Sequence, residues 1–323
     1  MSTLTCAVIG ASGIGKQHAK WYHMEGCRVA AFVGRTAESV AKTTETLKAL
    51  FPFAGRGYCD VQEMLAKERP DIVSVCSPPD RHKEHVVAAL GAGAHVFCEK
   101  PMVWRKGASS ASMLEDADQM IQAAGEGRRM LGLNTQYAAI LPDSLNIYPK
   151  ALGALRQITW IFMRMESKGA GGMKEHEDIW IDLASHPISL VLKWVSDGRL
   201  DEASARCVIS RKDNVAQFDW VRPDGGRCSV RAELGNIREG TPVRRLGVNG
   251  LIVDYAGRND TDGVFKTFLT VGNDVLKLDD LMRLAVRQFV QAVRTGGAPL
   301  VTGEEGRRNL EIQLKLLERC IRI

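Results

Sequence analysis

The chain lacks the features that mark a membrane-spanning or nucleic-acid-binding protein. None of its apolar runs approaches the roughly 18 residues that a membrane-spanning helix needs. Its formal charge of +5 is spread over 323 residues, and lysine and arginine form no block of the kind that nucleic-acid-binding segments carry. Three arginine pairs are expected to be solvated surface: Arg128-Arg129, Arg244-Arg245 and Arg307-Arg308. We therefore expect neither a membrane nor a nucleic acid as partner.

Cysteine pairs of the zinc-binding type are also missing. The eight cysteines include no CxxC pair, and several fall in apolar runs, where a free thiol behaves as a small buried hydrophobe. We therefore expect reduced cysteines, no metal site and a cytoplasmic location. Residues 1–5 lack the basic segment and apolar core of a signal peptide, which agrees with that expectation.

What the chain does contain is the composition of an ordinary globular protein. Hydrophobic residues make up 45% and charged residues 25% of it. A length of 323 residues predicts two domains or one large α/β unit. The mild excess of positive charge suits a small anionic partner such as a cofactor.

The first 133 residues alternate between strand-like and helix-like segments. Short, continuous apolar strands separated by helices indicate a parallel sheet that is covered on both faces. Right-handed crossovers then give a doubly wound Rossmann sheet. The predicted strands are 6–9, 29–33, 72–76, 96–98 and 130–133, and the predicted helices are 14–25, 37–50, 81–92 and 109–125.

The pattern changes near residue 135, where strands begin to follow one another. Such a succession predicts an α/β region with a mostly antiparallel open sheet. We expect a Rossmann domain of residues 1–133 and a second α/β domain of residues 134–323. The predicted helices are 139–152, 177–195, 279–295 and 304–322, and the predicted strands are 155–165, 203–210, 215–221, 227–234, 244–247, 251–255 and 265–271.

A glycine-rich turn joins the first predicted strand to the first predicted helix. Residues 10–15 are a variant of the GxGxxG fingerprint, in which the first glycine permits the tight turn and the last lets the helix pack on the strand. Serine takes the middle position, where it is small and can donate to a phosphate, and the helix N-terminus offers free N–H groups. The alternative is a glycine-rich turn without a ligand. The predicted dinucleotide-binding residues of this turn are Gly10, Ser12, Gly13, Ile14 and Gly15.

The end of the second predicted strand indicates which dinucleotide binds. NAD sites commonly carry an acidic residue here for the ribose 2′-hydroxyl, whereas this chain has none before Glu38. Arg35 is instead placed to meet a 2′-phosphate, with Thr36 as a second donor. The sequence therefore favours NADP(H), with NAD(H) as the alternative; an ordinary exposed Arg35 is the competing interpretation.

Lys100, Asp182 and His186 supply the expected chemistry. Lys100 follows an apolar run in Glu99-Lys100-Pro101, and Asp182 and His186 lie four residues apart, so on a helix they share a face. Oxidising an alcohol needs a base and reducing a carbonyl needs an acid, and histidine can be either near neutral pH. Lys100 can hydrogen-bond the same oxygen. Taken alone, His186 would be a helix histidine in a polar core contact and Lys100 a solvated loop lysine.

Together these motifs resemble the Gfo/Idh/MocA family of glucose–fructose oxidoreductase- and inositol dehydrogenase-like enzymes. The resemblance implies a Rossmann domain and an α/β domain whose open sheet mediates assembly, so we expect a homo-oligomer, a dimer or tetramer. It also implies that Lys100, Asp182 and His186 surround the substrate carbon and the nicotinamide. The matching segments are Gly10–Gly15, Ser77-Pro78-Pro79, Glu99-Lys100-Pro101, Gly171-Gly172, Asp182-x-x-x-His186 and Pro299–Gly306.

Further residues are expected near the cofactor. Ser77, Pro78 and His82 are expected at its edge, and Glu99 is expected either to position Lys100 or to contact the nicotinamide ribose. We also expect a cis Lys100–Pro101 bond, because the cis form costs little before proline.

Several positions depart from the family pattern. Ser189 stands three residues after His186, where members commonly carry aspartate, and residues 134–137 replace a more basic segment. Trp180 is interpreted as core rather than as pocket lining, and the polar loop 104–110 either shapes the site or merely connects. These departures argue against a plain sugar as substrate.

We therefore predict an NADP(H)-preferring oxidoreductase that transfers hydride between nicotinamide and a secondary alcohol or ketone carbon of a sugar-derived or other small polar metabolite. The enzymatic alternatives are an imine reductase and a hemiacetal semialdehyde dehydrogenase. The alternatives of other classes are a non-catalytic dinucleotide-binding regulator and a structural partner protein without a cofactor.

Overall fold

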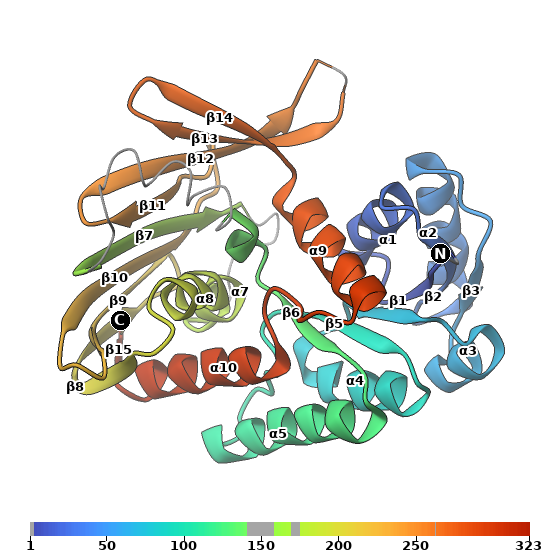
Figure 1. Ribbon diagram of the computed structural model, residues 1–323, viewed down its shortest axis with the longest axis horizontal. Helices are drawn as coiled ribbons and strands as arrows, with labels where there is room; N and C mark the ends of the chain where they lie inside the picture. Colours follow the sequence, from blue (N-terminus) through green and yellow to red (C-terminus); the bar gives the residue numbers. More distant parts are fainter. Residues whose placement is uncertain (1–2, 141–157, 169–174, 262) are drawn as a thin grey trace. The chain divides into compact units, whose positions relative to one another are not determined.

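The computed structural model describes residues 3–140, 158–168, 175–261 and 263–323 (Figure 1). Two sheets organise these residues, one of six strands and one of nine. The predicted fold class, a doubly wound Rossmann sheet plus an α/β region with a mostly antiparallel sheet, is confirmed. No helix among these residues is long and apolar enough to span a membrane.

The chain forms two compact units, and each of them is built from two separate stretches of the sequence. One unit comprises residues 1–136 and 282–308, and the other comprises residues 137–281 and 309–323. Helix α9 (Leu281–Thr295) thus returns to the first unit, where Phe289 stacks on Phe97 with ring centroids 4.8 Å apart. The division into a domain of residues 1–133 and a domain of residues 134–323 stays a prediction.

The first unit contains the six-stranded sheet, in the order β3-β2-β1-β4-β5-β6. Every neighbouring pair is parallel. The order reverses between β1 and β4, and doubly wound sheets bind their ligands at such a switch point. The strands are β1 (Thr5–Ile9), β2 (Arg28–Val33), β3 (Arg56–Tyr58), β4 (Ile72–Val75), β5 (His95–Glu99) and β6 (Leu131–Asn134).

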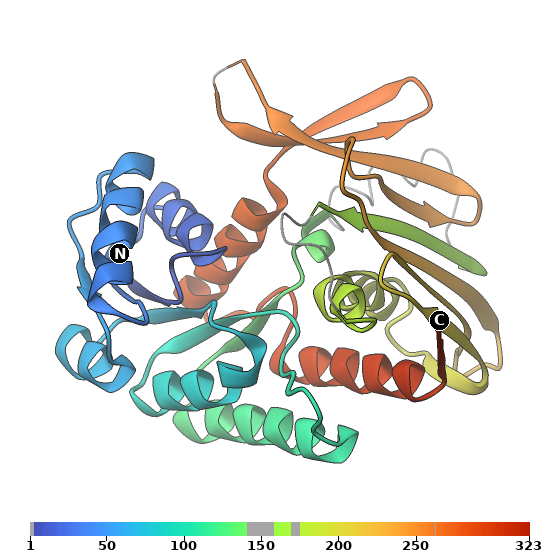
Figure 2. The same ribbon diagram turned by 180° about the vertical axis from the view of Figure 1, so that it is seen from behind.

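Helices cover both faces of this sheet, so its central strands are apolar throughout. Cys6, Ala7, Val8 and Val73 are fully buried. Helices α4 and α5 lie side by side on one face, as Figure 2 shows. The helices that connect the strands are α1 (Gly15–Met24), α2 (Ala37–Leu50), α3 (Val61–Glu68), α4 (His82–Gly91) and α5 (Ser110–Gly127).

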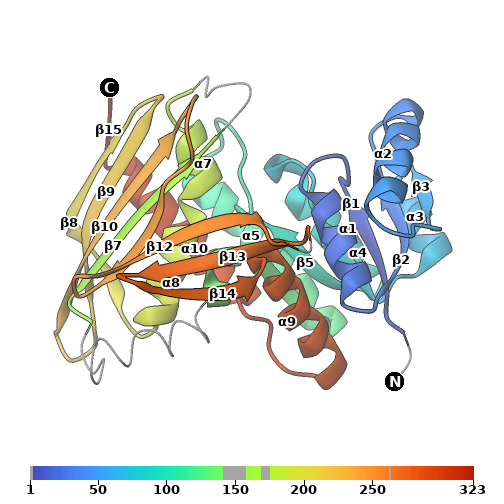
Figure 3. The same ribbon diagram turned by 90° about the horizontal axis from the view of Figure 1, so that it is seen from above.

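The second unit contains the nine-stranded sheet, in the order β14-β13-β12-β11-β7-β10-β9-β8-β15. Only the pairs β10–β7 and β15–β8 are parallel. Helices α7 (Asp178–Leu183) and α8 (Ser185–Trp194) lie on one face of it (Figure 3). The strands are β7 (Trp160–Ser167), β8 (Arg199–Ile209), β9 (Asp213–Val221), β10 (Arg227–Asn236), β11 (Arg244–Val248), β12 (Leu251–Asn259), β13 (Phe265–Val271), β14 (Asp274–Asp279) and β15 (Cys320–Arg322).

Some predicted elements differ from the observed ones. The helix predicted over 177–195 is two helices that meet at Ala184, and the last helix, α10 (Gly303–Glu318), ends before residue 322. The sequence analysis missed β3, α3, β14 and β15, of which β3 and β15 have only three residues each. The helix predicted over 139–152 and the Gly171-Gly172 motif lie largely or wholly outside the described residues.

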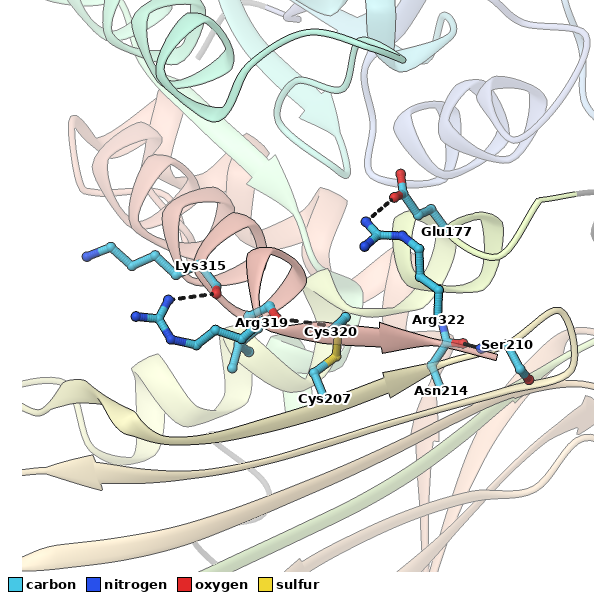
Figure 4. Close-up of a disulfide and its surroundings, with 9 residues drawn as sticks. Glu177, Cys207, Ser210, Asn214, Lys315, Arg319, Cys320 and Arg322 are labelled. Atoms are coloured by element: carbon cyan, nitrogen blue, oxygen red, sulfur yellow. Dashed lines mark hydrogen bonds and ion pairs between the residues drawn. A yellow bond between two sulfur atoms is a disulfide. The ribbon is translucent and has the colours of Figure 1, made fainter.

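One pair of cysteines corrects the expectation that all are reduced. Strand β15 runs parallel to β8 and places Cys320 opposite Cys207, and the two form a disulfide (Figure 4). Register causes the pairing, because the Cα atoms of the two residues are only 4.3 Å apart. Arg322 of the same strand donates to Glu177 at 2.7 Å. The other six cysteines are free thiols.

Candidate functional site

The glycine-rich turn between β1 and α1 has the conformation that its sequence requires. Gly10 has φ +90°, and a Cβ there would lie 2.6 Å from the carbonyl oxygen of Cys76. A Cβ on Gly15 would lie 2.5 Å from the carbonyl oxygen of Gly10. The first and last glycines therefore allow the turn, the helix and β4 to approach closely.

The middle of this turn presents a surface that fits a dinucleotide. Ser12 and Gly13 are exposed, and a Cβ on Gly13 would meet no atom within 4 Å. Ile14 is 44% exposed at the start of α1, which is unusual for a large apolar side chain. Backbone N–H groups at a helix start, open space in front of them and an uncovered apolar side chain suit a diphosphate beside a flat ring.

Arg35 and Thr36 lie at the start of α2, directly after the end of β2. Arg35 is exposed, and no ion pair to it occurs among the described residues. The Thr36 hydroxyl accepts a hydrogen bond from the Ser39 backbone at 3.1 Å, and the Ser39 hydroxyl accepts one from the Thr36 backbone at 3.0 Å. Thr36 thus caps the helix while keeping its own hydroxyl proton to donate.

His82 holds two turns together. It is fully buried, with Nε2 2.8 Å from the carbonyl oxygen of Ser77 and Nδ1 3.0 Å from that of Pro101. These contacts connect the turn after β4 to the turn after β5, and the place of His82 at the edge of the cofactor stays a prediction. Ser77 remains partly exposed, and Pro78 is exposed.

A buried polar network fixes Glu99 at the end of β5. His18 Nε2 lies 2.8 Å from Glu99 Oε1, Asn134 Nδ2 donates to the same oxygen at 2.6 Å, and the Lys100 backbone donates to Oε2 at 3.2 Å. Burial alone would raise the pKa of Glu99, but the bonds from His18 and Asn134 and the charges of His18 and Lys100 hold it at about 2. Glu99 is therefore a buried carboxylate at neutral pH.

Lys100 is placed by this carboxylate and by the bond that follows it. The Lys100–Pro101 peptide is cis, as expected. Lys100 is partly exposed, and its charge is among those that lower the pKa of Glu99. Of the two roles considered for Glu99, positioning Lys100 agrees with these contacts, because its two oxygens already accept three hydrogen bonds from the protein.

In the second unit, the junction of α7 and α8 carries Asp182 and His186. His186 is buried, 5% exposed, and Asp182 is partly exposed. Tyr137, in the turn Gln136–Ile140, lies edge-on to the His186 ring with centroids 4.8 Å apart. Burial raises the pKa of Tyr137, so its hydroxyl is neutral beside the imidazole.

Arg244 on β11 and Tyr255 on β12 lie next to Tyr137. The Tyr255 ring lies 5.5 Å from the Tyr137 ring, and the Arg244 guanidinium lies 5.7 Å from the centre of the Tyr255 ring. The charge of Arg244 opposes the rise in the pKa of Tyr137. The expectation that both residues of the 244–245 pair are solvated is therefore wrong for Arg244. Alternation along a strand, which turns successive side chains to opposite faces, is the sequence signal that was missed.

The remaining predicted positions have structural contacts. Ser189 is buried and accepts a hydrogen bond from Asn309 at 3.1 Å. Trp180 is 1% exposed and packs in the core, as expected. In the 104–110 loop, Arg105 pairs with Asp116 at 2.7 Å, which attaches the loop to α5.

Comparison with known proteins shows the family. Residues 4–135 match the family model GFO_IDH_MocA, described as an oxidoreductase family with an NAD-binding Rossmann fold. A 1,5-anhydro-D-fructose reductase from Ensifer adhaerens is 33% identical over 278 residues, which cover 78% of this chain and 78% of the relative. The chain belongs to the Gfo/Idh/MocA family. It is therefore an NAD(P)-dependent oxidoreductase, and the resemblance inferred from its motifs is confirmed.

Two further similarities extend along most of the chain. A 4-carboxy-2-hydroxymuconate-6-semialdehyde dehydrogenase from Sphingobium sp. is 29% identical over 308 residues, 91% of each protein. The structure of a 3-ketoreductase from Actinomadura kijaniata in complex with TDP-benzene and NADP covers 100% of this chain and 99% of its own, with a TM-score of 0.73 and 17% identity. At that identity, the second similarity shows the fold alone.

Proposed function

We propose that this Gfo/Idh/MocA protein is an NADP(H)-preferring oxidoreductase that acts on a secondary alcohol or ketone carbon of a sugar-derived metabolite. The observation that carries the cofactor preference is Arg35, exposed at the end of β2 with no acidic partner among the described residues and with a hydroxyl donor beside it. A guanidinium fork matches a phosphate well. The relative named as a 1,5-anhydro-D-fructose reductase supports a sugar-derived ketone and the direction of reduction.

In this proposal Lys100, Asp182 and His186 act on one substrate oxygen. The cofactor supplies or accepts the hydride when bound. His186 transfers the proton of the substrate hydroxyl, Lys100 hydrogen-bonds the oxygen as charge develops on it, and Asp182 orients the substrate or the imidazole. Glu99 keeps Lys100 in place, since its carboxylate accepts from the Lys100 backbone.

The most specific alternative is oxidation of a hemiacetal formed by a semialdehyde. It is supported by the relative named as a semialdehyde dehydrogenase, which matches 91% of the chain. The same proton-transfer residues serve both reactions, because the hemiacetal carbon carries a hydroxyl group and a hydrogen, as a secondary alcohol carbon does. Oxidation of such a substrate with NADP⁺, without reduction of 1,5-anhydro-D-fructose, would favour this alternative.

The cofactor proposal is tested by titrating NADPH and NADH into the wild type, Arg35→Ala and Arg28→Ala. Arg28 begins the strand that Arg35 follows, so it is a matched control at the opposite end of β2. We expect Arg35→Ala to weaken NADPH about tenfold or more and to leave NADH nearly unchanged, because only NADPH carries the phosphate. Tighter NADH in the wild type would overturn the preference, and equal weakening of both would remove Arg35 from this role.

The substrate proposal is tested by NADPH consumption with 1,5-anhydro-D-fructose and related ketoses. Turnover that disappears in His186→Ala would support it. Tight NADPH binding without turnover of any ketone, hemiacetal or imine would instead favour a non-catalytic regulator.

Assembly and location also belong to this proposal. We propose a homo-oligomer through the nine-stranded sheet, which light scattering would test; a monomer at micromolar concentration would contradict it. We propose a cytoplasmic location as well. Disulfides seldom persist in that compartment, so thiols counted in freshly lysed cells would test it: a quantitatively oxidised Cys207–Cys320 pair would contradict it.

A further inference from the structure

Arg244 lies on β11, and no carboxylate of the residues that the structure describes forms an ion pair with it. Glu166 exerts a charge effect on it but is already bonded to Arg164 at 2.7 Å and to the backbone of Val243 at 2.8 Å. A partly buried cation is costly unless something compensates it.

Among the described residues, the two aromatic groups beside Arg244 carry no charge. Tyr137 and Tyr255 both lie against it, and burial raises the pKa of each phenol, so both are neutral. Arg245 shows the contrast one residue along: it is exposed and pairs with Asp254 at 2.6 Å. The chain thus supplies an acidic partner for the surface arginine and, among the described residues, none for its neighbour.

Arg244 also lies close to the proposed proton-transfer residue. Tyr137 lies near both of them: its ring is edge-on to the His186 ring with centroids 4.8 Å apart, and the charge of Arg244 lowers the pKa of its hydroxyl. A molecule of the size of a sugar that offers a carbon to His186 can therefore extend to the guanidinium.

We propose that Arg244, flanked by Tyr137 and Tyr255, binds a carboxylate on the substrate. This inference rests on the proposed function, because it concerns the same substrate. The single positive charge of the guanidinium balances a single carboxylate, and the planar fork of arginine matches that planar group. The substrate class is then a hydroxy or keto acid derived from a sugar, rather than a neutral polyol.

The test measures binding to the NADP⁺-saturated protein by calorimetry, with pairs of probes that differ in one group. D-Glucuronate and D-glucose differ by a carboxylate in place of a hydroxymethyl group, and so do 2-keto-D-gluconate and D-fructose. In the wild type we expect at least one carboxylate to bind about tenfold or more tightly than its neutral partner. Arg244→Gln should erase this difference, Arg244→Lys should keep part of it, and Arg245→Gln should keep all of it.

Several results would overturn the inference. Equal binding within both pairs, no binding of either carboxylate, or a preference that survives Arg244→Gln would each do so. Loss of both members of a pair with a lowered melting temperature would show that Arg244 only braces the tyrosines. Tighter binding of D-glucose 6-phosphate than of D-glucuronate would assign Arg244 to a phosphate. Failure of NADPH to bind the same wild-type protein would contradict the proposed function instead.

Discussion

Glu99 in the first unit and Arg244 in the second differ in how the protein compensates their charges. In the first unit, Glu99 is compensated within the protein by His18, Asn134 and the backbone of Lys100. In the second, Arg244 lies beside the neutral tyrosines Tyr137 and Tyr255, and the nearby Glu166 is already paired with Arg164. A compensated group can hold its geometry before any ligand arrives, whereas an uncompensated one favours a ligand of opposite charge.

This difference agrees with a division of labour between cofactor and substrate. Every enzyme of this kind needs the same nicotinamide, so the groups near Lys100 can be fixed once by hydrogen bonds. Substrates differ between relatives, whose names include an anhydro-ketose reductase and a semialdehyde dehydrogenase. We therefore expect changes at Arg35, Thr36 and Glu99 to alter stability or cofactor binding, and changes at His186 and Arg244 to alter turnover or substrate choice.

The largest expected effect is on turnover. Lys100→Met and His186→Ala should each lower kcat about 10²–10⁴-fold, because each removes a group that handles the reacting oxygen or its proton. Steady-state kinetics with the best substrate measures this, and Lys42→Met, an exposed lysine of α2, is the control. Near-normal kcat in both variants would remove these residues from the chemistry.

The next largest effect is on stability, and it depends on whether the disulfide of the second unit is reduced. The disulfide in the second unit closes a loop between residues 113 apart, so reducing it should lower the free energy of unfolding by about 2–4 kcal/mol. Denaturant unfolding with and without dithiothreitol measures this. Cys320→Ser should not respond to the reductant, while Cys59→Ser, which alters an exposed free thiol, should behave as the wild type. Equal stability of the wild type in both conditions would contradict the cross-link.

Glu99, the compensated carboxylate of the first unit, should make the free energy of unfolding depend on pH in the acidic range. The pKa of Glu99 is lowered from 4.5 to about 2, so its contribution is present above pH 4.5 and is lost as the pH falls toward 2. Glu99→Gln should therefore cost on the order of 2 kcal/mol at pH 7 and less at pH 3. Urea unfolding at both values measures this, with the exposed Glu63→Gln as control. A cost independent of pH would show that the charge of Glu99 is not what stabilises the network.

The smallest effect concerns Thr36, which belongs to both the fold and the proposed phosphate site. Thr36→Ala should lower the free energy of unfolding by about 1 kcal/mol, because the N-cap of α2 is lost. Thr36→Ser keeps the cap and should retain both stability and NADPH affinity. If alanine weakens NADPH without changing stability, the hydroxyl serves the cofactor alone.

Sequence patterns predicted the Rossmann unit well, because its signals are local. The apolar run before Gly10, the glycine turn and the cis peptide at Pro101 are each specified by neighbouring residues. The short edge elements β3 and β15 were missed, because their residues pair with distant strands rather than following a local period.

The groups around the candidate site were harder to predict, because they meet through tertiary structure. Tyr137 meets His186 from 49 positions away in the sequence, and Arg244 meets Tyr255 through strand pairing. The disulfide likewise depends on the parallel register of β15 with β8, which no spacing of cysteines in the sequence indicates. Strand alternation would have separated Arg244 from Arg245, but not shown what Arg244 contacts.

The most direct test of this division is one NADPH titration, followed by fluorescence, of the wild type, Arg35→Ala, His186→Ala and Arg244→Gln. The account predicts that Arg35→Ala alone weakens NADPH, while His186→Ala and Arg244→Gln bind it as the wild type does. Weakening by His186→Ala or Arg244→Gln as large as that by Arg35→Ala would contradict the separation of cofactor binding from substrate chemistry.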